Sequence, residues 1–261
     1  MRPSAAHESR PDAPPAFTAV VPAAGAGARM GGRKPLLPLA EAPILLHTLR
    51  RLRLARGCAG LVLAVHAEDM DAVAGHLEEA GRQEGDLLVA ATLVEGGRNR
   101  QESVLAALRA ADPGVPLVLI HDAVRPLVRL SVIEDVAARA AECGAAIAAA
   151  PAVATIKEVG PDGVIRATPP RDGLRMAQTP QGFRRELALE AHLKACRDAF
   201  VGTDDSLLVE RMGGRVAVVE DRPDNIKITT PEDLVVAEAI LAWQRREGLP
   251  EAGSLAPEAH R

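Results

Sequence analysis

The sequence predicts an α/β fold in which helices flank a mostly parallel sheet. Short apolar runs alternate with segments of helical periodicity along most of the chain. Small-residue or polar turns follow several of the apolar runs. A length of 261 residues and an apolar content of 48% allow one large domain with a buried core. Together these observations indicate a Rossmann-like sheet, in which ligands bind beyond the carboxyl ends of the strands.

Strands and helices are expected to alternate from residue 17 to residue 152. Apolar runs mark the strands, and an apolar repeat of three to four residues marks the helices. The expected strands are 17–22, 60–66, 87–94, 116–121 and 145–152, and the expected helices are about 43–55, 69–80, 100–110 and 131–142.

The alternation of strands and helices ends after Val153. Residues 155–159 and 164–168 flank a Gly-Pro-Asp-Gly turn, which predicts a β-hairpin. We expect this segment, at about residues 153–172, to project from the sheet as a β-arm. The chain then returns to the body at 174–183 and continues with a helix at 184–197, a strand at 215–220 and a last helix from Pro231.

Composition limits the domain count, the location and the class of partner. Residues 17–246 are expected to form a single domain between a disordered tail at 1–16 and a mobile tail at 247–261. No hydrophobic signal segment and no long apolar run is present, which favours a soluble, cytoplasmic protein without a membrane partner. A net charge of −4 and an aromatic content of 2% argue against binding to nucleic acid.

Three cysteines, Cys58, Cys143 and Cys196, are widely spaced and form no Cys-x-x-Cys pair. Their number and spacing disfavour a disulfide framework and a zinc site. We expect all three to be buried, reduced thiols.

The first apolar strand runs into a loop of small residues, Ala23-Ala24-Gly25-Ala26-Gly27-Ala28, which is followed by Arg29 and Lys34. Small side chains, glycines that can take a positive φ and nearby cations are the combination that a nucleoside triphosphate requires. The loop is not the dinucleotide fingerprint, because Met30 stands where the third glycine would be, and its spacing is not that of a Walker A loop. An ordinary strand-to-helix turn with surface cations is the alternative.

A second glycine-containing turn, Gly96-Gly97-Arg98-Asn99-Arg100, precedes a helix at another strand end. Its glycines permit close approach of a base or ribose, Arg100 can reach a phosphate, and Ser103 can bond a ligand. The alternative is a helix start with an exposed arginine.

Asp122 directly follows the most hydrophobic strand and is the first candidate ligand for Mg²⁺, which prefers one or two carboxylates together with phosphate oxygens. Asp224 and Lys227, after a later strand, offer a second carboxylate and another cation, unless they form a polar turn. We expect His121 to be structural. The segment Thr203-Asp204-Asp205 could supply an acid, but we expect it to cap the helix that follows. Thr179, in Gln178-Thr179-Pro180-Gln181, is expected to position a substrate.

These residues suit transfer of a nucleotidyl group to a phosphate. A phosphate monoester is already mostly dianionic at neutral pH, so the attack needs no strong general base. Arg29, Lys34, Lys227 and a magnesium ion would offset the charge on the transferred phosphoryl group and on the departing pyrophosphate.

Five motifs, in this order along the chain, resemble those of the 2-C-methyl-D-erythritol 4-phosphate cytidylyltransferase family. They lie at residues 23–30, 96–104, 121–126, 177–181 and 224–229, and the resemblance spans about residues 17–243. It implies that CTP and methylerythritol phosphate give 4-diphosphocytidyl-methylerythritol and pyrophosphate, with Mg²⁺, in the non-mevalonate route to isoprenoids. It also implies a homodimer.

The resemblance assigns roles to individual residues. Arg29 and Lys34 match the family's pair at the transferring phosphoryl group, and Asp122, Arg125, Asp224 and Lys227 match its acidic and basic site groups. Contacts to CTP fall to Ala23, Ala24, Gly25, Ala26, Gly27, Gly97, Arg100 and Ser103. Thr155 and Arg171 match groups that bind the substrate phosphate in the other subunit's site, which would make the β-arm the dimer clasp.

Some positions depart from the family pattern. The loop between Arg29 and Lys34 is shorter than usual, so Arg33 is an alternative to Lys34 in the lysine's role. Ala154 precedes Thr155 where the family often has aspartate, and Thr-Asp-Asp-Ser-Leu replaces Thr-Asp-Asp-Ala-Ser. No zinc-binding Asp-x-His segment follows Arg245, so a fused cyclodiphosphate synthase is not expected.

Two other functions fit the same residues. The chain could transfer a cytidylyl group to another polyol phosphate, such as ribitol 5-phosphate, because the arm and Arg171 would recognise either phosphate. It could also be a module that binds a nucleotide without transfer. Substrate-dependent release of pyrophosphate distinguishes these functions.

Overall fold

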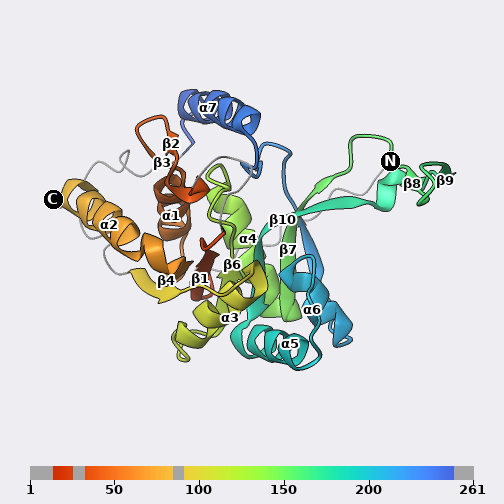
Figure 1. The fold of residues 1–261 in the computed structure, drawn as a ribbon, viewed down its shortest axis with the longest axis horizontal. Coiled ribbons are helices and arrows are strands. Elements are labelled where there is room, and N and C mark those ends of the chain that lie inside the picture. The colour runs from red at the N-terminus through yellow and green to blue at the C-terminus, as the bar shows by residue number, and fades with distance from the viewer. Residues whose placement is uncertain (1–13, 26–32, 85–90, 250–261) are drawn as a thin grey trace.

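A seven-stranded sheet forms the centre of the computed structural model, which describes residues 14–25, 33–84 and 91–249 (Figure 1). The strand order is β11-β7-β10-β6-β1-β4-β5. Neighbouring strands are parallel except at β10, which runs antiparallel to both β6 and β7. The strands are β1 (Phe17–Pro22), β4 (Cys58–Val65), β5 (Ala91–Glu95), β6 (Leu117–Ile120), β7 (Ala145–Pro151), β10 (Arg175–Arg184) and β11 (Ala217–Glu220). The predicted α/β fold with a mostly parallel sheet is therefore confirmed.

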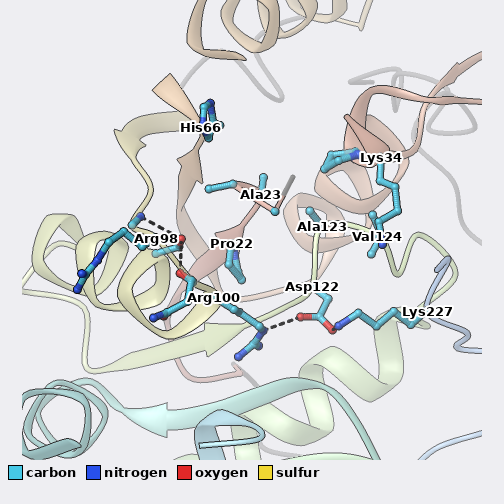
Figure 2. A pocket seen from close by; sticks show the side chains of 16 residues that line it. Pro22, Ala23, Lys34, His66, Arg98, Arg100, Asp122, Ala123, Val124 and Lys227 are labelled. Carbon is cyan, nitrogen blue, oxygen red and sulfur yellow. Dashed lines mark hydrogen bonds and ion pairs between the residues drawn. The ribbon is translucent and has the colours of Figure 1, made fainter. Parts of the chain in front are cut away.

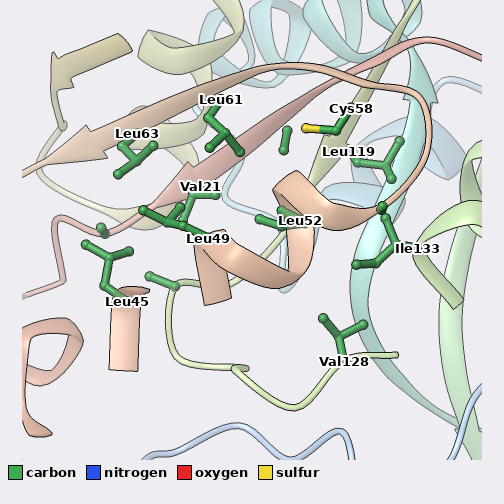
Figure 3. Close-up of a cluster of buried hydrophobic side chains, with 14 of the residues drawn as sticks. Val21, Leu45, Leu49, Leu52, Cys58, Leu61, Leu63, Leu119, Val128 and Ile133 are labelled. Carbon is green, nitrogen blue, oxygen red and sulfur yellow. The ribbon is translucent and has the colours of Figure 1, made fainter. Parts of the chain in front are cut away.

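Helices cover both faces of this sheet, because alternate residues of each strand point to opposite sides. On β1, Phe17, Ala19 and Val21 belong to a buried cluster with α1, α2 and α4 (Figure 3). Val20 faces the other way, into a cluster with α3, α5 and α6. The helices are α1 (Ile44–Leu54), α2 (Met70–Glu84), α3 (Arg100–Ala110), α4 (Leu130–Cys143), α5 (Arg185–Arg197), α6 (Asp205–Arg211) and α7 (Pro231–Arg246).

The last helix, α7, covers a third apolar cluster beside the strand ends. Ala237 and Leu241 of α7 belong to this cluster together with Leu39, Val124 and Ile228. As predicted, α7 begins at Pro231, and Thr230 and Asp233 form a capping box at its N-terminus. The loop that carries Asp224 and Lys227 is thereby held between β11 and a firmly capped helix.

Most predicted elements are present with boundaries shifted by a few residues. Strand β1 and helix α3 have the predicted bounds, whereas the predicted strand 87–94 is observed as β5 from Ala91, since residues 85–90 lie outside the described part. The sequence did not indicate the short strands β2 (Pro38–Leu39) and β3 (Ala42–Pro43) or the 3-10 helices η2 (Lys34–Leu36), η3 (Ala67–Asp69) and η4 (Arg171–Gly173). It also did not indicate the antiparallel direction of β10.

Between β7 and β10 the chain forms a separate two-stranded hairpin of β8 (Glu158–Val159) and β9 (Ile165–Ala167). Gly163 takes a φ of 77° in its turn, where the sequence has Gly-Pro-Asp-Gly. Figure 1 shows this hairpin, which we call the β-arm, lying far from the helices that flank the sheet.

The prediction of three buried thiols is wrong for two cysteines. All three are free, but only Cys58 is buried, and Cys143 and Cys196 are exposed. Cys143 is the last residue of α4 and Cys196 lies in the last turn of α5, and neither is among the buried residues of its helix. Among the described helices, none has the length and apolar character needed to cross a bilayer.

Candidate active site

A cavity of about 400 Å³ lies at the carboxyl ends of β1, β4, β5 and β6 (Figure 2). Strand β1 is central among these, and the chain crosses to β4 on one side of it and to β6 on the other. Such a point of reversal is where open α/β sheets bind ligands. The residues that line the cavity include Ala23, Ala24, Gly25, Lys34, His66, Gly97, Arg98, Asn99, Arg100, Ser103, Asp122 and Lys227.

The loop after β1 forms one wall of this cavity. The backbone N–H of Ala23 donates to Ala64 O at 2.7 Å, which ties the loop to β4. Gly25 does not take a left-handed φ, and a Cβ placed on it would meet no atom within 4 Å. A small residue here leaves space for a ligand, rather than serving an unusual backbone conformation. Ala26, Gly27 and Arg29 lie outside the described residues.

Lys34 and Arg33 have different surroundings although they are adjacent. Lys34 begins η2 and lines the cavity, and Figure 2 shows it on the side opposite Arg98. Arg33 forms ion pairs with Glu68 and Asp69 instead, and it is not among the lining residues. The structure thus brings Lys34, and not Arg33, to the cavity.

The second glycine turn packs against the first loop. A Cβ on Gly96 would lie 2.3 Å from the Cβ of Ala24, and one on Gly97 would lie 2.2 Å from the Cβ of Glu102. These glycines are therefore required by contacts within the protein, in addition to any contact with a ligand. Ser103 holds the same turn, since its Oγ accepts from the Gly97 N–H and donates to Asn99 O.

Asp122 is the centre of the charged groups in the cavity. Its Oδ1 accepts from Arg100 Nε at 3.0 Å, and its Oδ2 lies 2.8 Å from Lys227 Nζ and 3.6 Å from Arg125 Nε. Figure 2 shows Arg100 and Lys227 reaching it from opposite sides. Burial would raise the pKa of Asp122, but Arg100, Lys227 and Arg125 lower it far below its ordinary range. Asp122 is therefore a carboxylate at every physiological pH.

The loop from Asp224 to Ile228 brings Lys227 to Asp122. Ile228 is fully buried and its N–H donates to Val124 O at 3.0 Å. Asn225 is also buried, and its Nδ2 donates to Thr179 O and to Asp221 Oδ2. The Nη1 of Arg125 donates to Asn225 O at 2.6 Å, which helps to hold this loop in place. Arg125 is not among the residues that line the cavity.

His121 and Thr179 form a buried layer behind Asp122. Thr179 Oγ1 accepts from the Asp122 N–H at 3.1 Å and lies 3.0 Å from His121 Nδ1. Burial lowers the pKa of His121 to about 4, and its Nε2 is 3.0 Å from Arg125 O. His121 is structural, as predicted. Thr179 is also behind the cavity and not among the residues that line it.

Asp224 is not brought to Asp122 at the wall of the cavity. Its Oδ2 lies 2.7 Å from Arg129 Nη2, and Arg129 stacks over the ring of Trp243 in α7. Within the described residues, no group of three or more His, Cys, Asp or Glu side chains is arranged to hold a metal ion. In this part of the chain, the cavity therefore offers one carboxylate, that of Asp122.

Thr155 and Arg171 lie on or beside the β-arm, away from the cavity at the strand ends. Thr155 is exposed. Arg171 begins η4 and its Nη1 donates to Val153 O at 2.7 Å, beside a shallow depression that Asp172 and Arg175 also line. Within one chain, neither residue lines the cavity that contains Lys34 and Asp122.

Sequence reasoning missed His66 near the site, and it considered the segment that contains Asp205 without foreseeing the contact that Asp205 makes. His66 lines the cavity from the end of β4, where it follows a buried strand as Asp122 does, and that position could have identified it. Asp205 lies 2.8 Å from Arg100 Nη2 through its Oδ2. The pairing joins α3 to α6 across about 100 residues of sequence, and no local pattern indicates it.

Comparison with known proteins gives a consistent result. The sequence profile of the 2-C-methyl-D-erythritol 4-phosphate cytidylyltransferase family matches residues 17–243. The enzyme of that name from Bacillus cereus is 43% identical over 232 residues, which cover 88% of this chain and 100% of the relative. The one from Solibacter usitatus is 44% identical over 237 residues, which cover 85% and 94%.

Solved structures with the same fold carry related names. A 4-diphosphocytidyl-2C-methyl-D-erythritol synthase from Anaerococcus prevotii superposes with a TM-score of 0.77 at 30% identity, covering 87% of this chain and 96% of the other. The 2-C-methyl-D-erythritol 4-phosphate cytidylyltransferase of Thermus thermophilus superposes with a TM-score of 0.70 at 33% identity, covering 87% and 99%.

Proposed function

The chain belongs to the 2-C-methyl-D-erythritol 4-phosphate cytidylyltransferase family, and we propose that the cavity at the strand ends is its catalytic site. The reaction transfers a cytidylyl group from CTP to 2-C-methyl-D-erythritol 4-phosphate in isoprenoid precursor synthesis. The observation that carries the assignment of the site is the pairing of Arg100 and Lys227 with Asp122 in a cavity that Lys34 and the small residues after β1 also line.

The transfer is a single displacement at phosphorus. A phosphate oxygen of the sugar phosphate forms a bond to the α-phosphorus of CTP. The bond between that phosphorus and the oxygen that bridges it to the β-phosphorus breaks, and pyrophosphate leaves. The nucleophile is already ionised, so no side chain has to accept a proton. Lys34 and Lys227 line the cavity and would offset the negative charge that accumulates in the transition state. Arg29 is expected to add a third cation but lies outside the described residues.

Magnesium is the cofactor that we propose for this site. Mg²⁺ is commonly held by one or two carboxylates together with substrate phosphates and water. Asp122 supplies one carboxylate at the cavity wall, and its partner Lys227, whose side chain is 39% exposed, lines the same cavity. The residues present therefore fit an ion held by Asp122 and triphosphate oxygens. When bound, the ion would neutralise charge on the triphosphate. Asp224 as a second ligand stays a prediction.

A homodimer formed through the β-arm is also part of the proposal. The β-arm and its base expose several large apolar side chains, which is unusual for a surface that faces only water. They are Val153, Ile156, Val159, Val164, Ile165 and Met176. A second copy of the chain would bury these side chains. Thr155 and Arg171 of each chain would then reach the cavity of the other chain. The cytoplasmic location stays a prediction.

The overall activity is tested by measuring release of pyrophosphate from CTP. We expect release only when methylerythritol phosphate is present, and we expect EDTA to abolish it and Mg²⁺ to restore it. Faster turnover with ribitol 5-phosphate would contradict the assigned substrate. Binding of CTP without any turnover would instead identify a nucleotide-binding module.

Replacing Arg171 tests the β-arm. We expect Arg171→Ala to raise KM for the sugar phosphate by about 10- to 100-fold, the loss of one charge-assisted hydrogen bond, with little change in the KM for CTP. Steady-state kinetics with each substrate varied in turn measure this split. An equal rise in both KM values would contradict a role in binding the sugar phosphate.

Mixed dimers test whether the arm acts on the partner. Consider a dimer in which one chain carries Lys34→Met and the other carries Arg171→Ala. If Arg171 serves the partner's cavity, one of the two sites has both defects and the other has neither. After co-refolding the two variants, we expect recovery of about a quarter of the wild-type sites. Activity that never exceeds the sum of the separate variants would show that Arg171 acts within its own chain.

A further inference from the structure

Arg100, at the first position of α3, contacts two carboxylates from separate parts of the fold. Its Nε donates to Asp122 Oδ1 at 3.0 Å, and its Nη2 lies 2.8 Å from Asp205 Oδ2. These two nitrogens form the edge of the guanidinium that often closes on a single carboxylate in a bidentate pair. Here one nitrogen of that edge contacts Asp122 and the other contacts Asp205.

Asp205 differs from Asp122 because it does not line the cavity. Its side chain is 2% exposed at the start of α6. Burial would raise the pKa of Asp205, but Arg100 and His192 lower it, so the group is a buried carboxylate. Burying a charge is unfavourable unless partners compensate it. Its compensation comes from Arg100, whose side chain is 32% exposed and does line the cavity.

The position of the Asp205 carboxylate is determined from two sides. His192 of α5 is buried and places its Nε2 3.3 Å from Asp205 Oδ1. Gln181 of β10 accepts through Oε1 from the backbone N–H groups of Asp205 and Ser206, at 3.1 and 3.0 Å. His192 belongs to a helix that packs on the sheet, and Gln181 belongs to a strand of the sheet. Asp205 therefore gives Arg100 a fixed anchor outside the cavity.

We propose that Asp205 is a positioning residue that, by holding Nη2 of Arg100, keeps Oδ2 of Asp122 available to Lys227 and to ligands. If Nη2 were released, both donors of that edge could close on Asp122 and occupy both of its oxygens. Lys227 contacts the same Oδ2 at 2.8 Å, so this closure would displace it. The inference rests on the proposed function, because it concerns the charges that act on the triphosphate.

The variant Asp205→Asn tests the proposal, since it keeps the size of the side chain and removes its charge. We expect kcat to fall by about 10- to 100-fold, as for other groups that orient a functional residue. The KM for the sugar phosphate should change little, because the proposed site for its phosphate is on the β-arm. Asp198→Asn is the matched control. It makes the same chemical change at an aspartate whose carboxylate pairs with Lys194 and Arg211.

A double-mutant cycle separates positioning from simple support of the fold. If Asp205 acts through Arg100, adding Asp205→Asn to Arg100→Gln should leave kcat unchanged from that of Arg100→Gln alone. A further fall of tenfold or more in this background, or an unchanged kcat in folded Asp205→Asn, would overturn the proposal. Should Asp205→Asn alone not fold, as judged by circular dichroism, the comparison of the double variant with Arg100→Gln still decides it, because neutralising both members of a buried ion pair is better tolerated than neutralising one.

Failure of the proposed function would look different. In that case the wild-type chain itself would release no pyrophosphate from CTP and methylerythritol phosphate. The positioning role fails only when the wild type is active and the variants behave as described above.

Discussion

Replacing Lys34 with methionine is expected to lower kcat by about 100- to 1,000-fold, the usual effect of removing one preorganised group that stabilises transition-state charge. Lys34 lines the cavity at the start of η2, on the side opposite Arg98 of the second glycine turn (Figure 2). Methionine keeps the length and flexibility of the side chain but carries no charge. Pre-steady-state quenching, which measures the chemical step directly, is the appropriate assay, and thermal unfolding should show a nearly unchanged Tm.

Arg33→Met is the matched control for this prediction. It removes a cation from the adjacent residue, which pairs with Glu68 and Asp69 and does not line the cavity. Glu68 is exposed and Asp69 is buried, so the variant should lose about 1 to 3 kcal/mol of stability, the cost of leaving a buried acceptor without a partner, while the fold is retained. We expect kcat to stay within about threefold of the wild type. If Arg33→Met instead has the larger effect, the cationic role in this shortened loop belongs to Arg33.

The sequence predicted the fold well because its signals are local. Strand β1 and helix α3 have the predicted bounds, and the apolar run of β6 that precedes Asp122 is unmistakable. Motifs at strand ends also converge for a topological reason, since parallel strands present their carboxyl ends at one edge. Thus Gly25, Gly97 and Asp122, which are far apart in the sequence, line one cavity.

Pairings between distant residues could not be predicted in the same way. Thr179 lies within β10, and it bonds to the backbone N–H of Asp122 from behind the cavity. Asp224 has the residue type and position of a metal ligand, but Arg129 holds it. Asp205 lies in a segment expected to cap a helix, and its contact with Arg100 depends on how the fold brings the start of α6 to the start of α3. Residue type and spacing indicate which groups lie near an edge of the sheet, and packing determines which of them face the ligand.

Replacing Asp122 with asparagine should lower both kcat and the free energy of unfolding. Because Arg100, Lys227 and Arg125 all contact this carboxylate, its loss leaves three cations with reduced compensation. We expect kcat to fall by about 100-fold or more, since the proposed Mg²⁺ ligand and the organiser of the cations are both lost. We also expect the free energy of unfolding to fall by about 3 kcal/mol, the low end for a buried ion pair, because Arg100 and Lys227 are partly exposed.

The pH dependence of stability gives an independent measurement of the same carboxylate. Its pKa in the folded protein lies far below the ordinary value of 3.8, so its contribution to stability is complete above about pH 4 and is lost as the pH falls toward the folded pKa. Urea unfolding of wild type and Asp122→Asn should therefore differ by a constant amount near neutral pH and by less below about pH 4. Asp112→Asn, at an exposed turn where Asp112 Oδ1 accepts from the Gly114 N–H, is the control and should not change kcat. A constant difference down to the lowest pH would mean that the cations do not stabilise the charged form of Asp122.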